Sequence, residues 1–237
     1  MKISIPSASS IVGGLVGVFV IGSLIAMVYS MANPGPSPHV SGPAWNNNML
    51  MGSADAPNKV VEYSDYFCSH CAEFHHAAGD DFKRDFIEPK SVSFEMRMIN
   101  LLGDQVPNTN MGVDAAYCAA DQKKFWEYTH EIIVALEKDY FSKKIGIGPG
   151  YPQIEKLPVE YFVKPAATAG LNTREFETCV TTEKFASEIA ANTAKAQSLG
   201  VNALPQINVN NFQTSGFQGG YDQLKTLLKA GGVKFGD

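Results

Sequence analysis

A pair of cysteines stands where a predicted strand gives way to a predicted helix. The pair is Cys68-Ser69-His70-Cys71, and it follows closely on the apolar, β-prone run Val60-Val61-Glu62-Tyr63. The first cysteine would lie at the N-terminus of the helix, where unpaired main-chain N–H groups and the positive end of the helix dipole favour a thiolate. A thiolate is both the reactive form of cysteine and a good leaving group. The spacing therefore predicts a redox site.

Two other kinds of site also use closely spaced cysteines. A structural disulfide across so short a loop would gain little loop-closure stabilisation. His70, His75 and His76 could supply zinc ligands, but structural zinc usually needs a second ligand pair well separated in sequence, and none is evident. We therefore expect a redox-active disulfide between Cys68 and Cys71, with no metal and no cofactor. We assign no role to His75 and His76.

Each residue of the motif has an expected task. Cys68, at the start of the helix, is the expected nucleophile, and Cys71, one turn further in, is expected to be more buried and to resolve a mixed disulfide. His70 can stabilise the Cys68 thiolate as a cation or hydrogen-bond donor, which makes the disulfide more oxidising. The alternative for His70 is an ordinary solvated side chain.

Glu62 is expected in a central, buried strand, where a carboxylate is costly unless it has a task. It could accept the proton of Cys71 when that thiol attacks. The alternative is that Glu62 points to an edge of the sheet and is solvated.

The N-terminal segment has a different character. The uncharged, mainly apolar run from Ile11 to Tyr29 is longer than a signal-peptide core of ~7–15 residues and close to the ~20 that span a bilayer. We expect residues 1–32 to be a transmembrane anchor, or else a cleaved signal because Ser30-Met31-Ala32 weakly resembles a cleavage site. The positive charges of Lys2 and the amino terminus predict that the N-terminal end lies on the cytoplasmic side of the membrane. The proline-rich residues 33–49 are expected to form a flexible tether.

The periodicity of the remaining sequence predicts an α/β fold. A strand over 58–65, a helix over 68–87 and a strand over 92–98 form a βαβ unit, whose crossover requires a parallel pair. Further elements are expected over residues 183–199 (helix), 206–210 (strand), 212–217 (strand) and 221–230 (helix). Residues 109–184 show helical patterns only. We expect 50–108 and 185–237 to form one domain, with 109–184 inserted as an all-helical domain.

Cys118 and Cys179 each lie in a predicted helix of the insertion. Outside the cytoplasm disulfides persist, and once Cys68 and Cys71 are paired by their spacing, Cys118 is left with Cys179. Closing that loop would contribute roughly 3–4 kcal/mol by the chain-entropy relation. The alternative is two buried thiols.

Pro205 stands where a strand is expected to begin, so the Leu204–Pro205 bond is a candidate cis peptide, although a trans bond is the default for any single proline. A cis bond facing the cysteines would leave the main chain of Leu204 free to pair with an extended peptide.

The motif and the order of elements together resemble the DsbA-like thiol:disulfide oxidoreductases of the thioredoxin superfamily, over about residues 50–231. The resemblance implies a thioredoxin fold, in which a central mixed sheet is flanked by helices. His70 matches the histidine of the family's CxHC motif, and Glu62 falls on its buried acid. Leu204-Pro205 falls on its cis-proline dipeptide, and Cys118 with Cys179 looks like the second disulfide of some members.

Two positions depart from the family pattern. Ser69 replaces a common proline, and Leu204 replaces the usual valine or threonine. With Pro205, these residues are expected to contact substrate, so the departures bear on oxidising strength and substrate range.

The expected function is a membrane-anchored, extracytoplasmic thiol oxidase that acts as a monomer. Its clients would be reduced, cysteine-containing secreted or cell-envelope proteins, and the resemblance implies a quinone-linked membrane partner that reoxidises the cysteine pair. A net charge of −5 gives no reason to expect nucleic acid as a partner. The alternatives are a reductase or isomerase of the same fold, and a tethered chaperone or peptide-binding module.

Overall fold

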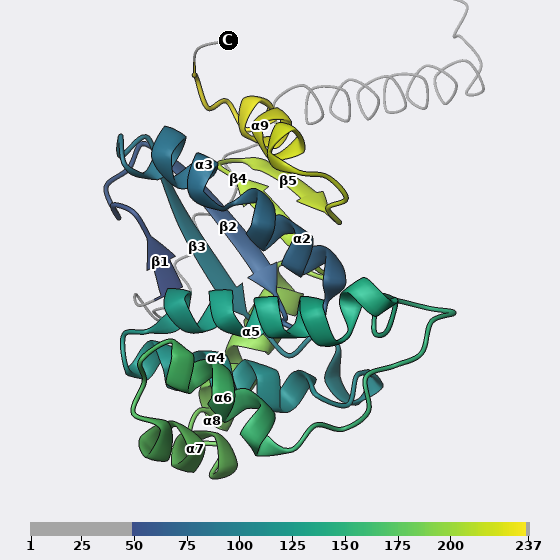
Figure 1. Cartoon of the computed structure of the whole chain (residues 1–237). Helices are drawn as coiled ribbons and strands as arrows, with labels where there is room; N and C mark the ends of the chain where they lie inside the picture. Colours follow the sequence, from purple (N-terminus) through teal and green to yellow (C-terminus); the bar gives the residue numbers. More distant parts are fainter. Residues whose placement is uncertain (1–48, 236–237) are drawn as a thin grey trace, which may run out of the picture. The chain divides into compact units, whose positions relative to one another are not determined.

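The computed structural model of the chain describes residues 49–235 (Figure 1). The predicted anchor, residues 1–32, and nearly all of the predicted tether, residues 33–49, lie outside the described residues. Within residues 49–235, no helix is both long and apolar enough to cross a membrane.

The described strands form a five-stranded mixed sheet in the order β1-β3-β2-β4-β5. They are β1 (Leu50–Met51), β2 (Asn58–Ser64), β3 (Val92–Met98), β4 (Gln206–Val209) and β5 (Phe212–Ser215). β2 and β3 are parallel, with Asn58 opposite Val92 and Ser64 opposite Met98, whereas the other neighbouring pairs are antiparallel. The predicted parallel βαβ unit and the mixed sheet are therefore confirmed.

Aromatic side chains form the core between the sheet and its helices. On β3, the ring of Phe94 lies 5.7 Å from that of Phe74 and 6.0 Å from that of Phe82, measured between centroids. Phe217, which follows β5, completes the cluster at 5.0 Å from Phe74. These rings join the β2–β3 unit to the C-terminal part of the chain, so the sheet and the redox helix share one core.

The prediction of one continuous helix over residues 68–87 is wrong. The segment consists of α2 (Ser69–Ala77), a short α3 (Asp80–Phe82) and a π-helical turn over Lys83–Ile87, with a non-helical Gly79 between α2 and α3. In a straight α-helix each step of four residues turns by about 40°, so Phe86 would point roughly 120° away from Phe74. The break and the wider π turn bring Phe82 and Phe86 back to the core, where both are buried.

Helices make up the segment between β3 and β4. They are α4 (Thr109–Asp121), α5 (Phe125–Asp139), α6 (Val159–Thr168), α7 (Thr173–Thr181) and α8 (Ala186–Ser198), with 3₁₀ turns over Gly103–Gln105 and Phe141–Lys143. Figure 1 shows α4 to α7 gathered at one end of the sheet and α3 and the C-terminal α9 (Tyr221–Ala230) toward its other end, with α2 between them. α8 begins three residues later than predicted, because Glu183 adopts a left-handed φ of 49° after α7.

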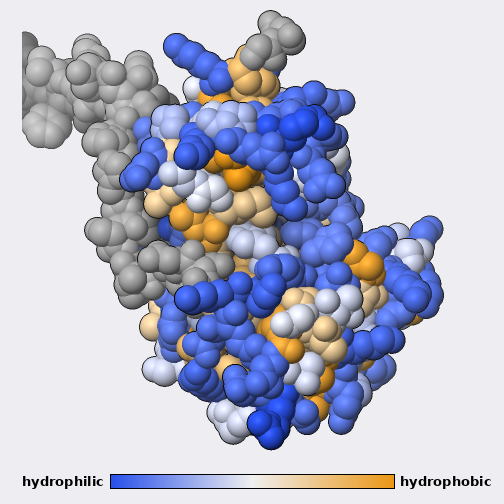
Figure 2. All heavy atoms as spheres, turned by 60° about the vertical axis from the view of Figure 1, so that its left-hand side comes forward, coloured by the Kyte–Doolittle hydropathy of each residue, from blue (hydrophilic) through white to orange (hydrophobic). Residues whose placement is uncertain are grey.

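The surface is mainly hydrophilic in the view of Figure 2, with apolar groups gathered near the middle of that face. Among the described residues, Val134 and Tyr151 are the large hydrophobic side chains that are exposed. The apolar groups in this view therefore belong mostly to partly buried side chains at the border of the core.

Candidate active site

The cysteine pair begins the helix that follows β2. Cys68 is the N-cap of α2 and has an extended main chain, and its carbonyl accepts hydrogen bonds from the N–H groups of Cys71 (3.0 Å) and Ala72 (3.1 Å). Cys68 is partly exposed, whereas Cys71 is buried. Both are free thiols in this structure, which is the reduced form of the pair. A partner can therefore reach Cys68, with Cys71 behind it.

Cys71 is held as a neutral thiol. Burial raises its pKa well above the ordinary value, and the neighbouring Cys68 and the charge of Glu62 act in the same direction. A main-chain hydrogen bond from Asp65 acts against them. The Cys71 thiol thus needs a proton acceptor or a hydrogen-bond donor before it can attack.

Glu62 lies in β2, the central strand of the sheet, and is fully buried. The alternative of a solvated edge carboxylate is therefore wrong. The Ser64 hydroxyl donates a 2.9 Å hydrogen bond to its Oε1, while Oε2 has no hydrogen-bond partner within the described part of the chain. Burial raises the pKa of Glu62 well above its usual range, and the charge of Cys68 raises it further. Glu62 therefore keeps its proton to a higher pH than an ordinary glutamate does.

Glu62→Gln should change how stability depends on pH. The folded protein keeps a proton on Glu62 that the unfolded chain releases above pH ~4.3, so the free energy of unfolding falls as pH rises toward the folded pKa. In Glu62→Gln the free energy of unfolding should therefore decrease less steeply, by about 1.4 kcal/mol per pH unit, between pH ~4.3 and the pKa of Glu62 in the folded protein. Urea unfolding of both proteins between pH 5 and pH 8 measures the slope, and equal slopes would show that Glu62 is ionised when folded.

His70 is partly exposed on the first turn of α2. Its Nδ1 lies 3.4 Å from Oε2 of Glu73, a residue that the sequence analysis left out. The imidazole of His70 therefore has a carboxylate partner one turn further along α2. Ser69 is also partly exposed beside the pair.

His75 contacts two other imidazoles at the junction of α2 and α5. Its ring centroid lies 6.2 Å from that of His76 and 6.3 Å from that of His130. Burial, followed by these two neighbours, lowers the pKa of His75 to about 3, so it is neutral at physiological pH. In residues 49–235 no group of three or more His, Cys, Asp or Glu side chains is arranged to hold a metal ion.

The proline loop reaches the same end of the sheet. The Leu204–Pro205 peptide bond is cis. β4 pairs antiparallel with β2, with Tyr63 opposite Gln206, so continuing this register places Pro205 beside Ser64, just before the turn to Cys68. Leu204 is partly exposed and packs against a small cluster that includes Tyr63. The cis-proline dipeptide and the cysteines therefore border one region.

An open cavity of about 690 Å³ adjoins α2. Its lining includes His70 and Glu73 from the first turns of α2, Asp80 and Asp81 from α3, and Tyr221 from the start of α9. A segment of another chain that reaches Cys68 therefore has room beside the redox helix.

The sequence analysis missed Asp65, which lies between Glu62 and Cys68. Asp65 is fully buried, and burial raises the pKa of its carboxyl to about 7. The sequence does carry a signal that Asp65 is buried. Asp65 follows directly on a buried strand and precedes the aromatic pair Tyr66-Phe67, where a charged residue is costly unless it has a task. Asp is also a common turn residue, which makes the signal easy to overlook.

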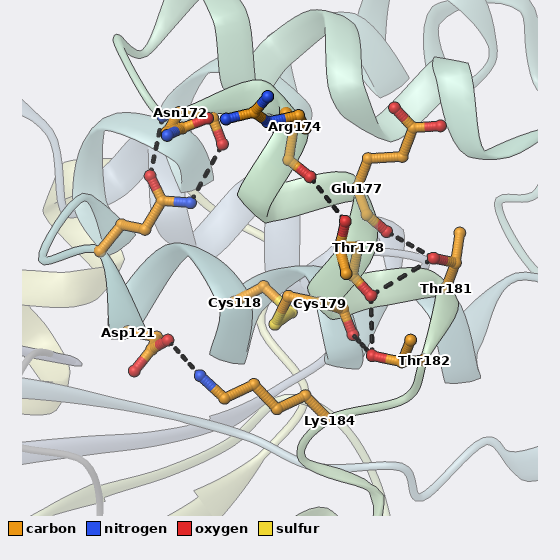
Figure 3. Close-up of a disulfide and its surroundings, with 11 residues drawn as sticks. Cys118, Asp121, Asn172, Arg174, Glu177, Thr178, Cys179, Thr181, Thr182 and Lys184 are labelled. Carbon is orange, nitrogen blue, oxygen red and sulfur yellow. Dashed lines mark hydrogen bonds and ion pairs between the residues drawn. A yellow bond between two sulfur atoms is a disulfide. The ribbon is translucent and has the colours of Figure 1, made fainter.

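Cys118 and Cys179 form a disulfide between α4 and α7 (Figure 3). The S–S distance is 1.99 Å and the sequence separation is 61. Close by, Nζ of Lys184 forms a 2.6 Å ion pair with Asp121, also drawn in Figure 3. The bridge joins α4 to α7 and is separate from the Cys68/Cys71 pair.

A thioredoxin family model matches residues 45–230, so the chain belongs to the thioredoxin family. Disulfide bond formation protein D of Bacillus subtilis is 24% identical over 192 residues, which are 80% of each chain. Relatives from Rickettsia conorii and Rickettsia typhi, which bear names of the protein-disulfide oxidoreductase type, are each 25% identical over 179 residues, or 73% of this chain. The chain spans only 56% and 58% of the length of these two relatives.

Solved structures show the same fold. Oxidised BdbD from Bacillus subtilis superposes with a TM-score of 0.60 at 21% identity, over 80% of this chain and 95% of that one. DsbA of Chlamydia trachomatis gives a TM-score of 0.58 at 16% identity, over 83% and 96%. The resemblance to the DsbA-like thiol:disulfide oxidoreductases is confirmed.

Proposed function

We propose that this chain is an extracytoplasmic thiol:disulfide oxidoreductase that donates disulfide bonds to reduced secreted or cell-envelope proteins. The observation that carries the proposal is the asymmetry of the cysteine pair: Cys68 caps the N-terminus of α2 and is partly exposed, whereas Cys71 is buried behind it. The names of the relatives, disulfide bond formation protein D among them, support the same class of activity.

In the proposed reaction the oxidised pair is the oxidant. A client thiolate attacks Cys68, so a client–Cys68 disulfide forms, the Cys68–Cys71 bond breaks, and Cys71 leaves as a thiolate. Glu62, whose raised pKa lets it hold a proton, is the proposed donor to that thiolate. The client's second thiolate then attacks its own sulfur in the mixed disulfide, and Cys68 leaves as a thiolate that the helix N-terminus stabilises.

The partners of the reaction are part of the proposal. The client main chain would pair with Leu204 beside the cis-Pro205, and Ser69 would lie against the client next to Cys68. A quinone-linked membrane protein would reoxidise the reduced pair. The N-terminal segment would hold the catalytic domain, as a monomer, at the outer side of the membrane where that partner resides.

The reduction potential of the Cys68/Cys71 pair tests the direction of the reaction. The full chain is equilibrated with glutathione buffers, and the fraction of reduced pair is measured by thiol alkylation. A value near about −120 mV is expected, as for a strong oxidant. A value near about −270 mV would instead indicate a reductase, the rival of the same fold.

A further inference from the structure

Glu62 points to the face of the sheet that α2 covers. Val60 lies opposite Phe94 in the register of β2 and β3, so these two side chains share a face, and the Phe94 ring lies 5.7 Å from that of Phe74 in α2. Side chains alternate between the two faces along a strand, so Glu62 and Ser64 point to the same side as Val60. The Glu62 carboxyl group is therefore enclosed between the central strand and the redox helix.

The residues opposite Glu62 on the two neighbouring strands are apolar. They are Met96 of β3 and Ile207 of β4, and both are buried. A buried carboxyl group among apolar neighbours is costly unless it finds a hydrogen bond. In the described part of the chain that bond comes from the Ser64 hydroxyl, two residues along the same strand, which donates to Oε1 at 2.9 Å. One serine therefore supplies what neither neighbouring strand offers.

The main chain of Ser64 is fixed on both sides. Ser64 is buried and is the last residue of β2, and its carbonyl accepts a 3.1 Å hydrogen bond from the Ile99 N–H. On its other side, the register of β4 continues to Pro205. The hydroxyl therefore holds Glu62 in one orientation, in which Oε1 is bonded and Oε2 has no hydrogen-bond partner among residues 49–235.

The titratable groups that face Glu62 from the redox helix are two thiols. They are Cys68 at the N-cap of α2 and Cys71 in its first turn, and the charge of Glu62 interacts with both. The next acid along the chain, Asp65, uses its Oδ1 to accept a 2.8 Å hydrogen bond from the Phe67 N–H of its own turn. The cysteine pair is therefore the group with which Glu62 can exchange a proton.

We propose that Ser64 is a positioning residue, whose hydroxyl holds Oε1 of Glu62 so that the carboxylate can take the proton of Cys71. The step concerned is the resolution of a mixed disulfide at Cys68, which returns the pair to its oxidised form. The proton of Cys71 passes to Glu62, the Cys71 thiolate attacks the Cys68 sulfur, the Cys68–Cys71 bond forms, and the leaving group departs as a thiolate. Burial raises the pKa of Glu62, and the Ser64 hydrogen bond opposes this rise because it favours the charged form. This inference rests on the proposed function.

The pH profile of the resolution step tests the proposal. The full chain, with its Cys68/Cys71 pair reduced, is mixed with excess oxidised glutathione, and formation and resolution of the Cys68–glutathione disulfide are followed as separate phases. Ser64→Ala removes the hydroxyl, so Glu62 should keep its proton to a higher pH, and the midpoint of the resolution profile should move about one unit upward. Ser64→Thr keeps the hydroxyl, and its midpoint should remain within about half a unit of the wild type.

Two controls show whether Ser64 acts through Glu62. Glutamine keeps an acceptor oxygen but does not titrate, so Ser64→Ala added to Glu62→Gln should cause no further shift of the profile. Ser93→Ala is the matched control: Ser93 is also a buried strand serine, but it precedes Phe94 on β3 and so points to the opposite face of the sheet. It should leave the profile unchanged. Thermal unfolding shows whether each variant is folded, and if Ser64→Thr cannot accommodate its extra methyl group, the Glu62→Gln background still decides.

The outcomes separate this inference from the function on which it rests. A wild type that forms no mixed disulfide with glutathione would overturn the proposed function and this inference with it. If the wild type resolves the mixed disulfide and Glu62→Gln has the same pH profile, the roles of Glu62 and Ser64 are both wrong, although the chemistry of the cysteines stands. A Ser64→Ala midpoint equal to that of the wild type would overturn the role of Ser64 alone. An equal shift by Ser64→Ala with and without Glu62 would do the same, since the proposed role requires the carboxylate.

Discussion

Cys68→Ser is expected to reduce the oxidation of a dithiol client to the uncatalysed level, a loss of at least about a thousandfold. A serine hydroxyl cannot form the disulfide that carries the oxidising equivalents, and Cys71 is too buried to replace Cys68. The rate of disulfide formation in a reduced model client, followed by loss of free thiols, measures the effect. Full activity of the Cys68→Ser protein would contradict the proposed mechanism.

Cys71→Ser separates the roles of the two cysteines. The exposed Cys68 remains and can still form a bond with a client, but the internal thiol that would release it is missing. Client–Cys68 mixed disulfides should therefore accumulate, and non-reducing electrophoresis would show them. A variant lacking both cysteines should form none. If that double variant still supported a wild-type phenotype and bound clients, the chaperone alternative would replace the enzyme.

Elements with strong local signals could be predicted from the sequence. The bounds of Val92–Met98 and of Tyr221–Ala230 follow from local patterns, and the structure has both as predicted. The alternation in Val92–Met98 predicts one buried face, whereas Ser93 and Arg97 on the other face are buried as well. β1 could not be predicted, because Leu50–Met51 is too short for any periodicity and is defined only by its pairing with β3. The break at Gly79 also depends on tertiary packing, since it returns Phe86 to a core that the local pattern does not describe.

Within the candidate site, too, some features follow from local sequence patterns and others depend on contacts distant in sequence. The burial of Glu62 followed from its place in a central strand, which the sequence pattern identifies. The burial of Asp65 depends instead on α4 and α5, which cover the turn through Gly112 and Thr129. How a helical segment docks on a sheet is set by contacts distant in sequence, so the sequence offers only a weak signal that Asp65 is buried.

Removing the second disulfide should have the largest effect on stability. Cys118→Ala with Cys179→Ala frees a loop with a sequence separation of 61, and the chain-entropy relation gives a loss of about 4 kcal/mol. For a domain of this size the midpoint of thermal unfolding should fall by about 10 °C. Guanidinium unfolding under identical conditions measures the difference in free energy.

Activity should survive this double substitution, because α4 and α7 keep other contacts and the Cys68/Cys71 pair is untouched. Gln122, just after α4, and Asn172, just before α7, exchange hydrogen bonds of 3.2 and 2.8 Å. Lys184→Gln is the matched control: it breaks the exposed ion pair with Asp121 beside the bridge and should cost less than about 1 kcal/mol. If the double variant is folded but has lost oxidase activity, the bridge does more than stabilise the fold. Cys118 and Cys179 would then take part in the redox chemistry.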